Sequence, residues 1–503
     1  MKKILYNKIF LISFIFIIIL YIFKIILLTF TTLIDDEAYY ALWTKHLPIG
    51  FFDHGAGIAF FMKVSILVFG YNGFGVRIGS IIFSILVSIV LFIFLKKEKD
   101  ENTAIISVIL FNIIPFFAGL SLIVTIDTPM FYFMILAIIY FYKSIYYDKK
   151  YFYLSGFLFG FALLSKINAL IIIITILVFL FLIKNKKDFF YSKEFYIFGI
   201  IIFITYLPFV VYVFQTDFAP IIYIINRLDK IGSINRTLDF WGAQIGLYSP
   251  LFFILFCYLI VKVFIDFFNK KEIEKDFYFA FISLLPFIYI LFKSFKNKLE
   301  ANWGLFVYAG GLFLVSYYIS KNWNKKYIRN LFFANILFCN TAIFIIILQY
   351  FIPIIPIKGD PTDRYYKYNV IRYDLKEYYN SYMDKDIRIF GLNYQIPSMI
   401  NFYIQPEKES VCLNWGTYHP TVFDFWYNDK DFISNDFYHI STSSDTNLLY
   451  KYFDSIEYIT NFQSYRKLLN NNIRKLDNFY IFLCKNYKGR QMDYIYKSDK
   501  MKF

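Results

Sequence analysis

Three consecutive carboxylates lie in the stretch 32–57, directly after an almost uninterrupted apolar run at 9–30. They are Asp35, Asp36 and Glu37. A carboxylate at the end of a membrane-spanning helix is costly to keep partly desolvated, so three in a row favour a functional role. The alternative is that they are ordinary solvated loop charges. Further candidate residues follow in the same stretch: Tyr39, Tyr40, Trp43, Asp53 and His54.

A fourth carboxylate, Asp127 in the motif TIDTP, precedes another apolar run. If both runs cross the membrane, Asp36 and Asp127 lie at the same ends of different helices and can converge. A carboxylate in a partly dry cleft can act as a general base on a hydroxyl, because burial raises its pKa. Asp36 and Asp127 are therefore predicted as catalytic groups, together with Glu37.

Cations near the same ends could hold a phosphate whose lipid tail lies in the bilayer, and arginine does so with two parallel hydrogen bonds. For Lys166, which separates two apolar runs, the alternative is a structural lysine that reaches to the membrane interface. The candidate cations are Lys63, Arg77, Lys166, Arg227, Arg236 and Lys298.

Aromatic side chains in these segments could stack on the apolar face of a sugar ring. Trp and Tyr also populate the membrane interface for no catalytic reason, and for any single residue that interpretation is favoured. The candidate aromatic residues are Tyr39, Tyr40, Trp43, Trp241 and Trp303.

No metal-binding motif of known spacing is present, because His46 and the pair Asp53-His54 do not form a zinc pattern. The sequence also lacks a Walker loop, a GxGxxG motif and a nucleophile elbow. A divalent cation held by Asp36, Glu37 and Asp127 is chemically open but has no other support. We therefore assign no cofactor.

Long apolar runs must position these groups. The chain of 503 residues is 58% hydrophobic, far above a soluble domain, and a membrane span needs about 20 apolar residues. The sequence therefore predicts a polytopic α-helical membrane protein. Its expected spans are 9–30, 74–95, 103–122, 128–147, 151–166, 167–184, 195–214, 245–268, 277–295, 303–320 and 330–353.

Lysine-rich connections set the expected orientation. If the N-terminus is cytoplasmic, five Lys-rich loops all fall on the cytoplasmic side, as the positive-inside rule requires. These loops are 96–102, 148–150, 184–194, 269–276 and 320–330. The net charge of +15 is thereby explained by membrane topology, which excludes nucleic acid as the expected partner.

The opposite, extracytoplasmic side gathers acids and bases from separate helices, as an active site at the membrane surface would. Its first loop, 31–73, is long, and 57–70 is too short to span, so a helix in the membrane plane is expected there. Later outer loops carry Asp127, Lys166, Arg227, Arg236, Trp241, Gln244, Lys298, Glu300, Asn302 and Trp303.

Residues 1–356 are thus expected to form the membrane domain and residues 357–503 a soluble extracytoplasmic α/β domain. Strands are predicted at 386–391, 410–414, 436–442 and 477–485, and helices near 371–383 and 445–470. Cys412 and Cys484 could pair in this domain, but the sequence does not give their separation. The domain's role is open between acceptor docking and a structural cap.

Seven motifs occur in the order seen in one known family: DDEAYYALW, FFDHGAGIAFF, FGVRIGS, TIDTP, LLSK, FWGAQIGLYSP and KLEANW. With them the chain resembles the GT-C membrane glycosyltransferases, in the branch of the dolichyl-phosphate-mannose protein mannosyltransferases and aminoarabinose transferases. The segments 360–364, 393–404 and 424–426 also fit. The resemblance covers about 33–430.

This resemblance implies a polyprenyl-phosphate sugar donor and inversion at the anomeric carbon. It places Asp36, beside Glu37, as base or acceptor-orienting group and Asp127 as the second acid. It implies that Lys166, with Arg227 or Arg236, holds the donor phosphate. His54 is a substrate or phosphate contact, although the usual Pro-Pro after it is replaced here by Gly55-Ala56. Gln244, Lys298, Glu300, Asn302 and Trp303 fall in matching outer-loop motifs, and Tyr39, Tyr40 and Arg77 in earlier ones.

The sequence therefore predicts a bacterial inner-membrane enzyme that moves one sugar from undecaprenyl phosphate to a glycan, lipid or protein of the cell envelope. A flippase for lipid-linked sugars is the alternative, but it would place charges near the bilayer midplane and show repeated halves. A sugar-lipid binding protein with an inactive site is a third reading, and the intact Asp36, Asp127 and Lys298 argue against it.

Overall fold

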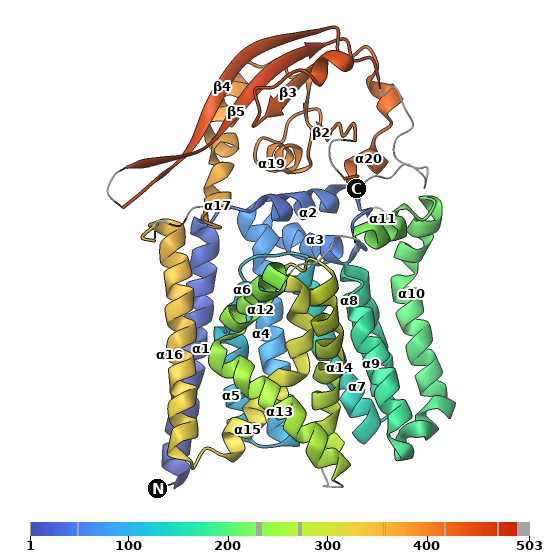
Figure 1. Ribbon diagram of the computed structural model, residues 1–503, viewed down its shortest axis with the longest axis vertical. Helices are drawn as coiled ribbons and strands as arrows, with labels where there is room; N and C mark the ends of the chain where they lie inside the picture. The colour runs from blue at the N-terminus through green and yellow to red at the C-terminus, as the bar shows by residue number, and fades with distance from the viewer. Residues whose placement is uncertain are drawn as a thin grey trace.

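The computed structural model describes residues 2–47, 50–227, 234–269, 274–355, 357, 359–416, 419–469 and 472–489, without the side chains of 2–10, 184–187 and 226–227. Helices form a bundle at one end of the molecule, and a mixed β-sheet lies at the other (Figure 1).

Within this described part, eight helical segments are long and apolar enough to cross a membrane. They are Leu11–Phe30 within α1 (Lys2–Phe30), α4 (Gly73–Glu98), α7 (Asp127–Tyr146), α10 (Lys193–Gln215), α13 (Pro250–Phe268), α14 (Glu274–Lys296), η2 with α15 (Ala301–Lys321) and α16 (Lys326–Phe351). Shorter apolar helices occupy the other three expected spans: α5 (Glu101–Ile113), α8 (Tyr151–Ser165) and α9 (Ala169–Leu182).

The expected span 103–122 is divided at Pro115. Ile114 has an extended ψ of 123°, and α6 (Pro115–Gly119) begins directly after it. Proline lacks a backbone N–H and disfavours the helical conformation in the residue before it, so α5 ends there. The interruption is followed by residues 118–127, most of which line a cavity described below.

The lysine-rich connections gather at the end of the bundle away from the sheet (Figure 1). Two ion pairs join neighbouring connections there, Lys99 with Asp276 at 2.6 Å and Lys275 with Glu98 at 2.8 Å. This common location is what the positive-inside rule requires of cytoplasmic loops.

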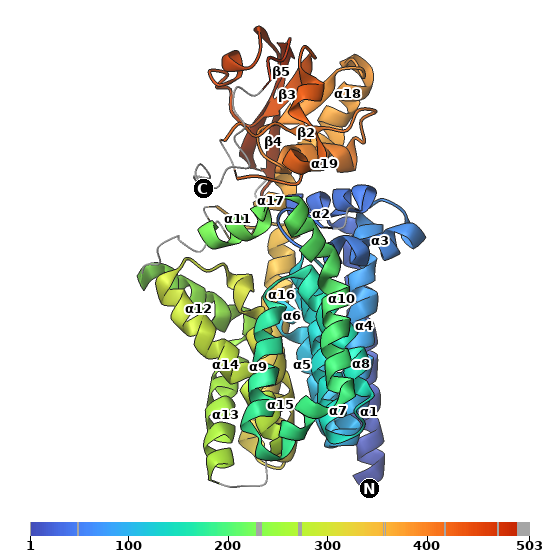
Figure 2. The same cartoon turned by 90° about the vertical axis from the view of Figure 1, so that its right-hand side faces the viewer.

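Helices α2 (Asp35–His46) and α3 (Gly57–Phe69) lie across the sheet-facing end of the bundle (Figure 2). The helix expected at 57–70 is present. Val64, Leu67 and Val68 are 67–72% exposed, so one face of α3 is apolar and uncovered. Such a face fits a helix that lies in the membrane interface.

The C-terminal part contains a five-stranded sheet in the order β2-β1-β3-β5-β4, parallel at β2/β1/β3 and antiparallel at β3/β5/β4. Its strands are β1 (Arg388–Gly391), β2 (Val411–Cys412), β3 (Phe437–Ser441), β4 (Ser455–Lys467) and β5 (Ile473–Lys485). Its helical elements are α17 (Asp363–Lys367), η3 (Ile371–Leu375), α18 (Lys376–Tyr382), α19 (Gln395–Tyr403), α20 (Phe423–Trp426), η4 (Asp429–Phe432) and η5 (Leu449–Lys451). The remaining elements of the helical part are η1 (Lys184–Tyr191), α11 (Ala219–Arg227) and α12 (Ile234–Tyr248).

The helix predicted near 445–470 is wrong, because β4 (Ser455–Lys467) occupies half of that segment. Four of the five residues in Ile456–Thr460 are isoleucine, tyrosine or threonine, and side chains of these types favour strands. Antiparallel pairing along β5 then supplies partners for the backbone groups on one side of β4, which is the edge strand of the sheet. Neither Cys412 nor Cys484 forms a disulfide. They lie on β2 and β5, three strand spacings or about 14 Å apart, which is too far for a disulfide.

His46 joins the first loop to the sheet domain. Its Nε2 lies 2.7 Å from Glu409 Oε2, and its ring stacks on Trp426 with centroids 4.1 Å apart. Burial alone would raise the pKa of the Glu409 carboxyl, but the hydrogen bonds from His46 and Tyr427 outweigh burial and hold the pKa below its ordinary value of 4.5.

Glu409→Gln should lower stability at about pH 7 and progressively less as the pH falls below 4.5, with little effect at about pH 2. A lowered folded-state pKa stabilises fully above pH 4.5, and that contribution disappears as the pH falls through the folded value. Unfolding midpoints of purified wild-type and variant protein at both pH values would measure it, with the exposed neighbour Glu407→Gln as control. An equal difference in unfolding midpoint between wild type and variant at both pH values would contradict a stabilising role of the Glu409 charge.

Candidate active site

A cavity of about 820 Å³ lies where the helical bundle meets the sheet domain. The α1–α2 junction, the loop before α7, the α8–α9 turn, α11, the α14–η2 turn and the α16–α17 segment all contribute to its walls. Eleven of the residues predicted from the sequence line it: Asp36, Tyr39, Tyr40, Asp53, His54, Arg77, Asp127, Lys166, Glu300, Asn302 and Trp303.

Asp36 reaches the cavity from the first turn of α2, with a side chain that is 27% exposed. Two groups from the C-terminal part donate to its carboxylate: Tyr394 Oη to Oδ1 at 2.7 Å and Arg364 Nη2 to Oδ2 at 2.8 Å. Burial and the Asp36 charge raise the pKa of Tyr394, which keeps its hydroxyl a donor. Within the described part of the chain, each oxygen of Asp36 therefore has one fixed donor and a lone pair that no other partner occupies.

Arg364 also bonds Asp35 through Nε, 2.5 Å from Oδ1, so one guanidinium bridges two adjacent carboxylates. Burial raises the pKa of Asp35, the Arg364 charge lowers it, and the neighbouring Asp36 raises it again, with a net rise. The bridge thus reduces the repulsion between Asp35 and Asp36, which the sequence places side by side.

Asp127 is the first residue of α7 and is almost fully buried. Its Oδ1 lies 2.7 Å from Lys166 Nζ, and its Oδ2 accepts from Asn302 Nδ2 at 2.7 Å. A carboxylate at a helix N-terminus is favoured by the helix dipole. The three residues come from α7, the α8–α9 turn and η2, so the triad ties three segments together at the cavity wall.

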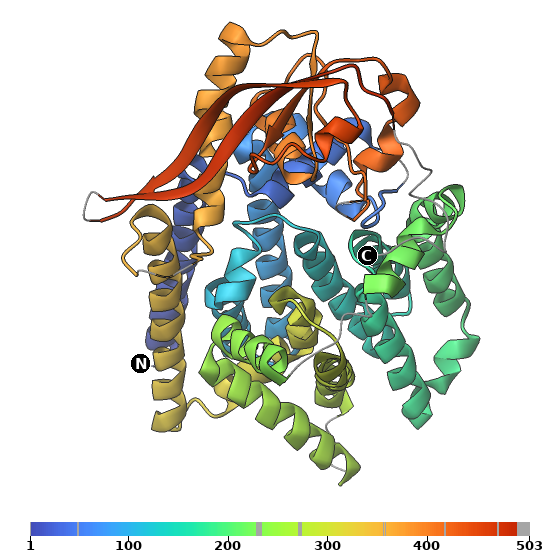
Figure 3. The same ribbon diagram turned by 45° about the horizontal axis from the view of Figure 1, so that its top comes forward.

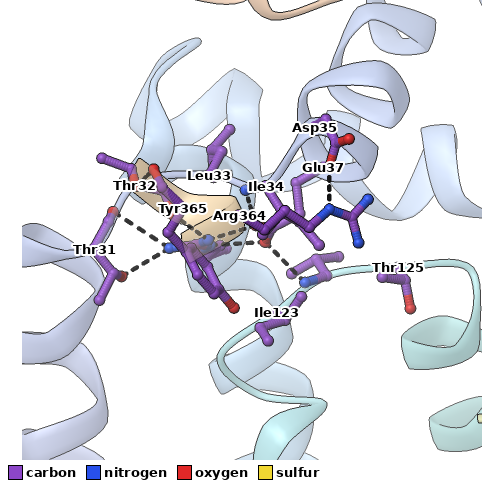
Figure 4. A network of polar contacts seen from close by, with 12 residues as sticks. Thr31, Thr32, Leu33, Ile34, Asp35, Glu37, Ile123, Thr125, Arg364 and Tyr365 are labelled. Carbon is purple, nitrogen blue, oxygen red and sulfur yellow. Dashed lines mark hydrogen bonds and ion pairs between the residues drawn. The ribbon is translucent and has the colours of Figure 1, made fainter. Parts of the chain in front are cut away.

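Glu37 does not line the cavity. It is fully buried and paired with Arg77, whose Nε lies 2.7 Å from Glu37 Oε1 and whose Nη2 bonds Oε2. The backbone N–H groups of Ile34 and Val124 also donate to this carboxylate, at 3.1 and 2.9 Å. Figure 4 shows the network joining the α1–α2 junction to residues 123–125. Both carboxylate oxygens of Glu37 therefore accept hydrogen bonds from groups that hold the fold together.

An aromatic wall extends from Asp36 toward the sheet domain. Tyr39 Oη donates to Asp53 Oδ2 at 2.7 Å and accepts from the Val422 N–H at 3.0 Å. Its ring lies 4.4 Å from that of Tyr394. Tyr40 and His419 line the same cavity, whereas Trp43 is fully buried on Phe51 and belongs to the core.

The loop Asp53–Gly57 depends on close approach to α8. A Cβ on Gly55 would lie 2.1 Å from the Leu164 carbonyl oxygen, and one on Gly57 would lie 2.3 Å from Ser165 Oγ. Glycine permits this contact because it has no Cβ. The two glycines therefore let this loop pack on the residues that precede Lys166, and His54 of this loop lines the cavity.

Several predicted residues lie elsewhere. Gln244 is buried and donates to the Ala301 carbonyl at 2.8 Å, and Lys298 is exposed and paired with Glu300 at 3.1 Å. Arg236 is exposed outside the cavity lining, and the side chain of Arg227 lies outside the described residues. Within the described part, no group of three or more His, Cys, Asp or Glu side chains is placed to hold a metal ion.

The sequence reasoning missed the roles of Arg364, Tyr394, Lys293 and His419, all of which line the cavity. The segments 360–364 and 393–404 resembled the known family, which was the available signal. However, Arg364 and Tyr394 are 328 and 358 residues from Asp36, and no local spacing indicates a contact at such a separation.

Comparison with known proteins agrees with this architecture. Residues 53–212 match the family model described as dolichyl-phosphate-mannose-protein mannosyltransferase. The crystal structure of apo ArnT from Cupriavidus metallidurans superposes with a TM-score of 0.65 at 11% identity, covering 95% of this chain and 98% of ArnT. The chain has the GT-C fold. ArnT bound to undecaprenyl phosphate superposes with a TM-score of 0.62 over the same shares, also at 11% identity. No curated protein sequence matches the chain.

These findings confirm the resemblance to the GT-C glycosyltransferases and the predicted fold class. The family match spans the loop with Asp53, the residues around Asp127 and Lys166, and most of α10. The structural match extends over nearly the whole chain, including the sheet domain that supplies Tyr394.

Glu37→Gln should lower the free energy of unfolding by about 3–5 kcal/mol, because it leaves the buried Arg77 charge without its partner. Asp36→Asn, the matched change one residue earlier at a partly exposed ion pair, should cost about 0–1 kcal/mol. Unfolding in mixed micelles would measure both. Equal losses would contradict the distinction between a structural Glu37 and a cavity-lining Asp36.

Gly55→Ala should destabilise the protein by about 1–3 kcal/mol, because the added methyl group overlaps the backbone of α8 and must displace the His54 loop. Gly246→Ala on α12 is the control, since a Cβ there meets nothing within 4 Å. Thermal unfolding of both purified variants would test this, and a Gly55→Ala protein as stable as the control would contradict it.

Proposed function

We propose that this protein transfers a sugar from a polyprenyl-phosphate carrier to an extracytoplasmic acceptor. One observation carries the proposal: a single cavity holds Asp36 on one wall and the Asp127–Lys166–Asn302 triad on another. The GT-C fold supports it, since the structural relative ArnT has been solved with undecaprenyl phosphate.

The apolar part of the cavity suits the lipid chain of the donor. Leu27 of α1, Pro115 of α6 and Ile343, Ile346 and Ile347 of α16 line this part. All five lie in or beside membrane-spanning helices, so a polyprenyl chain can reach the cavity from the bilayer without crossing water.

Lys166 and Lys293 are the proposed contacts of the donor phosphate. Lys166 Nζ keeps further N–H donors beyond its bond to Asp127. Lys293, near the end of α14, donates to Tyr289 Oη at 3.0 Å and lies over the Trp303 ring at 5.2 Å. Among the described residues, no carboxylate is ion-paired with Lys293, so its charge is available to an anion.

Asp36 is proposed as the general base. The acceptor hydroxyl donates to a free lone pair of Asp36, and its oxygen attacks the anomeric carbon from the side opposite the phosphate. A new C–O bond forms, the bond to the phosphate oxygen breaks with its electron pair leaving on the phosphate, and the proton passes to Asp36. Lys166 and Lys293 stabilise the charge that develops on the phosphate. Attack from the opposite face inverts the anomeric carbon.

Asp127 then acts through Lys166, because its buried carboxylate holds the Lys166 ammonium toward the cavity. Asn302 in turn fixes that carboxylate by donating to its other oxygen. If the acceptor is already an anion, such as a lipid phosphate, it needs no base and Asp36 only orients it. The aromatic residues Tyr39, Tyr40 and Tyr394 offer stacking surfaces for the sugar.

The topology is part of the proposal. Residues 1–356 form the membrane domain with a cytoplasmic N-terminus, and residues 357–503 form the extracytoplasmic domain of a bacterial inner-membrane protein. The common end of the lysine-rich connections, away from the sheet, supports this orientation.

Asp36→Asn should reduce transfer to a hydroxyl acceptor by about 10²–10⁴-fold, the usual contribution of a general base. Mass spectrometry of envelope lipids, surface glycans and secreted proteins would compare cells carrying wild-type protein and Asp36→Asn. The loss of one sugar increment would identify the sugar and the acceptor class. Near-normal transfer to a hydroxyl would contradict the base role, and accumulation of lipid-linked sugar on the cytoplasmic side without a lost increment would favour a flippase.

A further inference from the structure

We infer that Arg466 of β4 is a positioning residue for the transfer reaction, because it holds the start of α17 so that Arg364 reaches Asp36. The inference rests on the proposed function. Arg466 does not line the cavity, and its side chain is only 1% exposed. A cation this deeply buried must be paired, since burial of an unpaired charge is costly.

The Arg466 guanidinium binds the segment just before and within α17. Its Nη1 lies 2.6 Å from Asp363 Oδ1, 2.8 Å from Thr362 Oγ1 and 3.3 Å from Asp360 Oδ2. Arg474 on β5 takes the other oxygen of Asp363 at 2.9 Å. Both strands of the β4–β5 hairpin therefore hold the first residue of α17.

The same guanidinium also holds the end of α16. Its Nη2 donates to the carbonyl oxygens of Gln349 and Tyr350, the latter at 2.8 Å. Carbonyl groups at a helix C-terminus lack intrahelical partners and carry partial negative charge, so a cation is favoured there. Figures 1 and 3 show the hairpin reaching across to the top of α16 beside α17. One side chain thus fastens α16, α17 and the hairpin together.

Fixing Asp363 determines where Arg364 points. Successive residues of an α-helix project about 100° apart, so a helix held by Asp363 on the hairpin side presents Arg364 on another side. That side faces α2, where Arg364 bonds Asp35 at 2.5 Å and Asp36 at 2.8 Å. A helix of five residues has little stability of its own. Its direction therefore depends on these outside contacts.

The segment held by Arg466 also anchors the base of α2. The Thr32 N–H donates to Tyr350 Oη at 3.1 Å, and Thr32 Oγ1 donates to the Tyr365 carbonyl at 2.9 Å. Lys166 and Lys293 lie on other segments. Loss of the Arg466 contacts to α17 alone should therefore change the placement of Asp36 and its partner and leave the phosphate contacts in place. We expect a slower reaction with unchanged donor-lipid binding.

The test uses Asp363→Asn in the full-length protein, which keeps the side-chain shape and the Arg466 bonds to α16 but removes the ion pairs to α17. The sugar increment on the envelope should form about 10- to 100-fold more slowly, as expected when a reacting group is misplaced. Purified Asp363→Asn should bind undecaprenyl phosphate like the wild type. Arg466→Met should also slow the reaction, and Arg466→Lys should recover part of the rate.

Two comparisons separate positioning from general stability. Lys467→Met removes an exposed charge from the next residue of the same strand and should leave the rate unchanged. In an Arg364→Met background, Asp363→Asn should cause no further loss, because the group that it positions is already gone.

A wild-type rate for Asp363→Asn, or a loss that adds fully to that of Arg364→Met, would overturn the inference. Weakened binding of undecaprenyl phosphate by Asp363→Asn would also overturn it. These results are distinct from failure of the proposed function, in which wild-type protein and Asp36→Asn would show the same envelope increments.

Discussion

The buried ion pair between Glu37 and Arg77 is the interaction on which the rest of the site depends. Arg77 lies within a membrane-spanning helix, where an unpaired charge is very costly, so its carboxylate partner is effectively fixed. Because Glu37 is in the first turn of α2, this pair sets where α2 begins and how it is rotated. The rotation then directs Asp35 and Asp36 away from Arg77, toward the sheet domain.

Three adjacent acids therefore have three different surroundings. Glu37 is directed into the bundle, Asp35 is buried against Arg364, and Asp36 reaches the cavity between Arg364 and Tyr394. Like charges at such short range repel one another unless cations lie between them. The bundle supplies one cation and the C-terminal part supplies the other, so the acidic motif is stable only where the two parts meet. This accounts for the contact between the C-terminal part and the end of the helical bundle that holds the cavity.

On the other wall of the cavity, buried charges are likewise neutralised by partners from different segments. Asp127 and Lys166 neutralise each other in nearly complete burial, and Asn302 takes the remaining carboxylate oxygen. The three side chains come from segments far apart in the sequence, and the glycine loop at 55–57 lies directly against the residues that precede Lys166. Charge pairing fixes this wall, and the loss of any one partner would leave a buried group unsatisfied.

The sequence by itself determined the membrane-spanning helices, the in-plane helix at 57–70, the α/β character of the C-terminal part and most of the cavity's acids. These follow from local information: apolar runs of membrane length, charge placement between them and the alternation of strand residues. The one element of wrong type, the helix near 445–470, formed a strand because pairing with β5 decided its backbone conformation. Only the tertiary structure decided which acid faces the cavity, because that depends on Arg77, Arg364 and Tyr394, which lie 40 to 358 residues away in the chain. A hydrogen bond acts over about 3 Å, and sequence separation says nothing about distance on that scale.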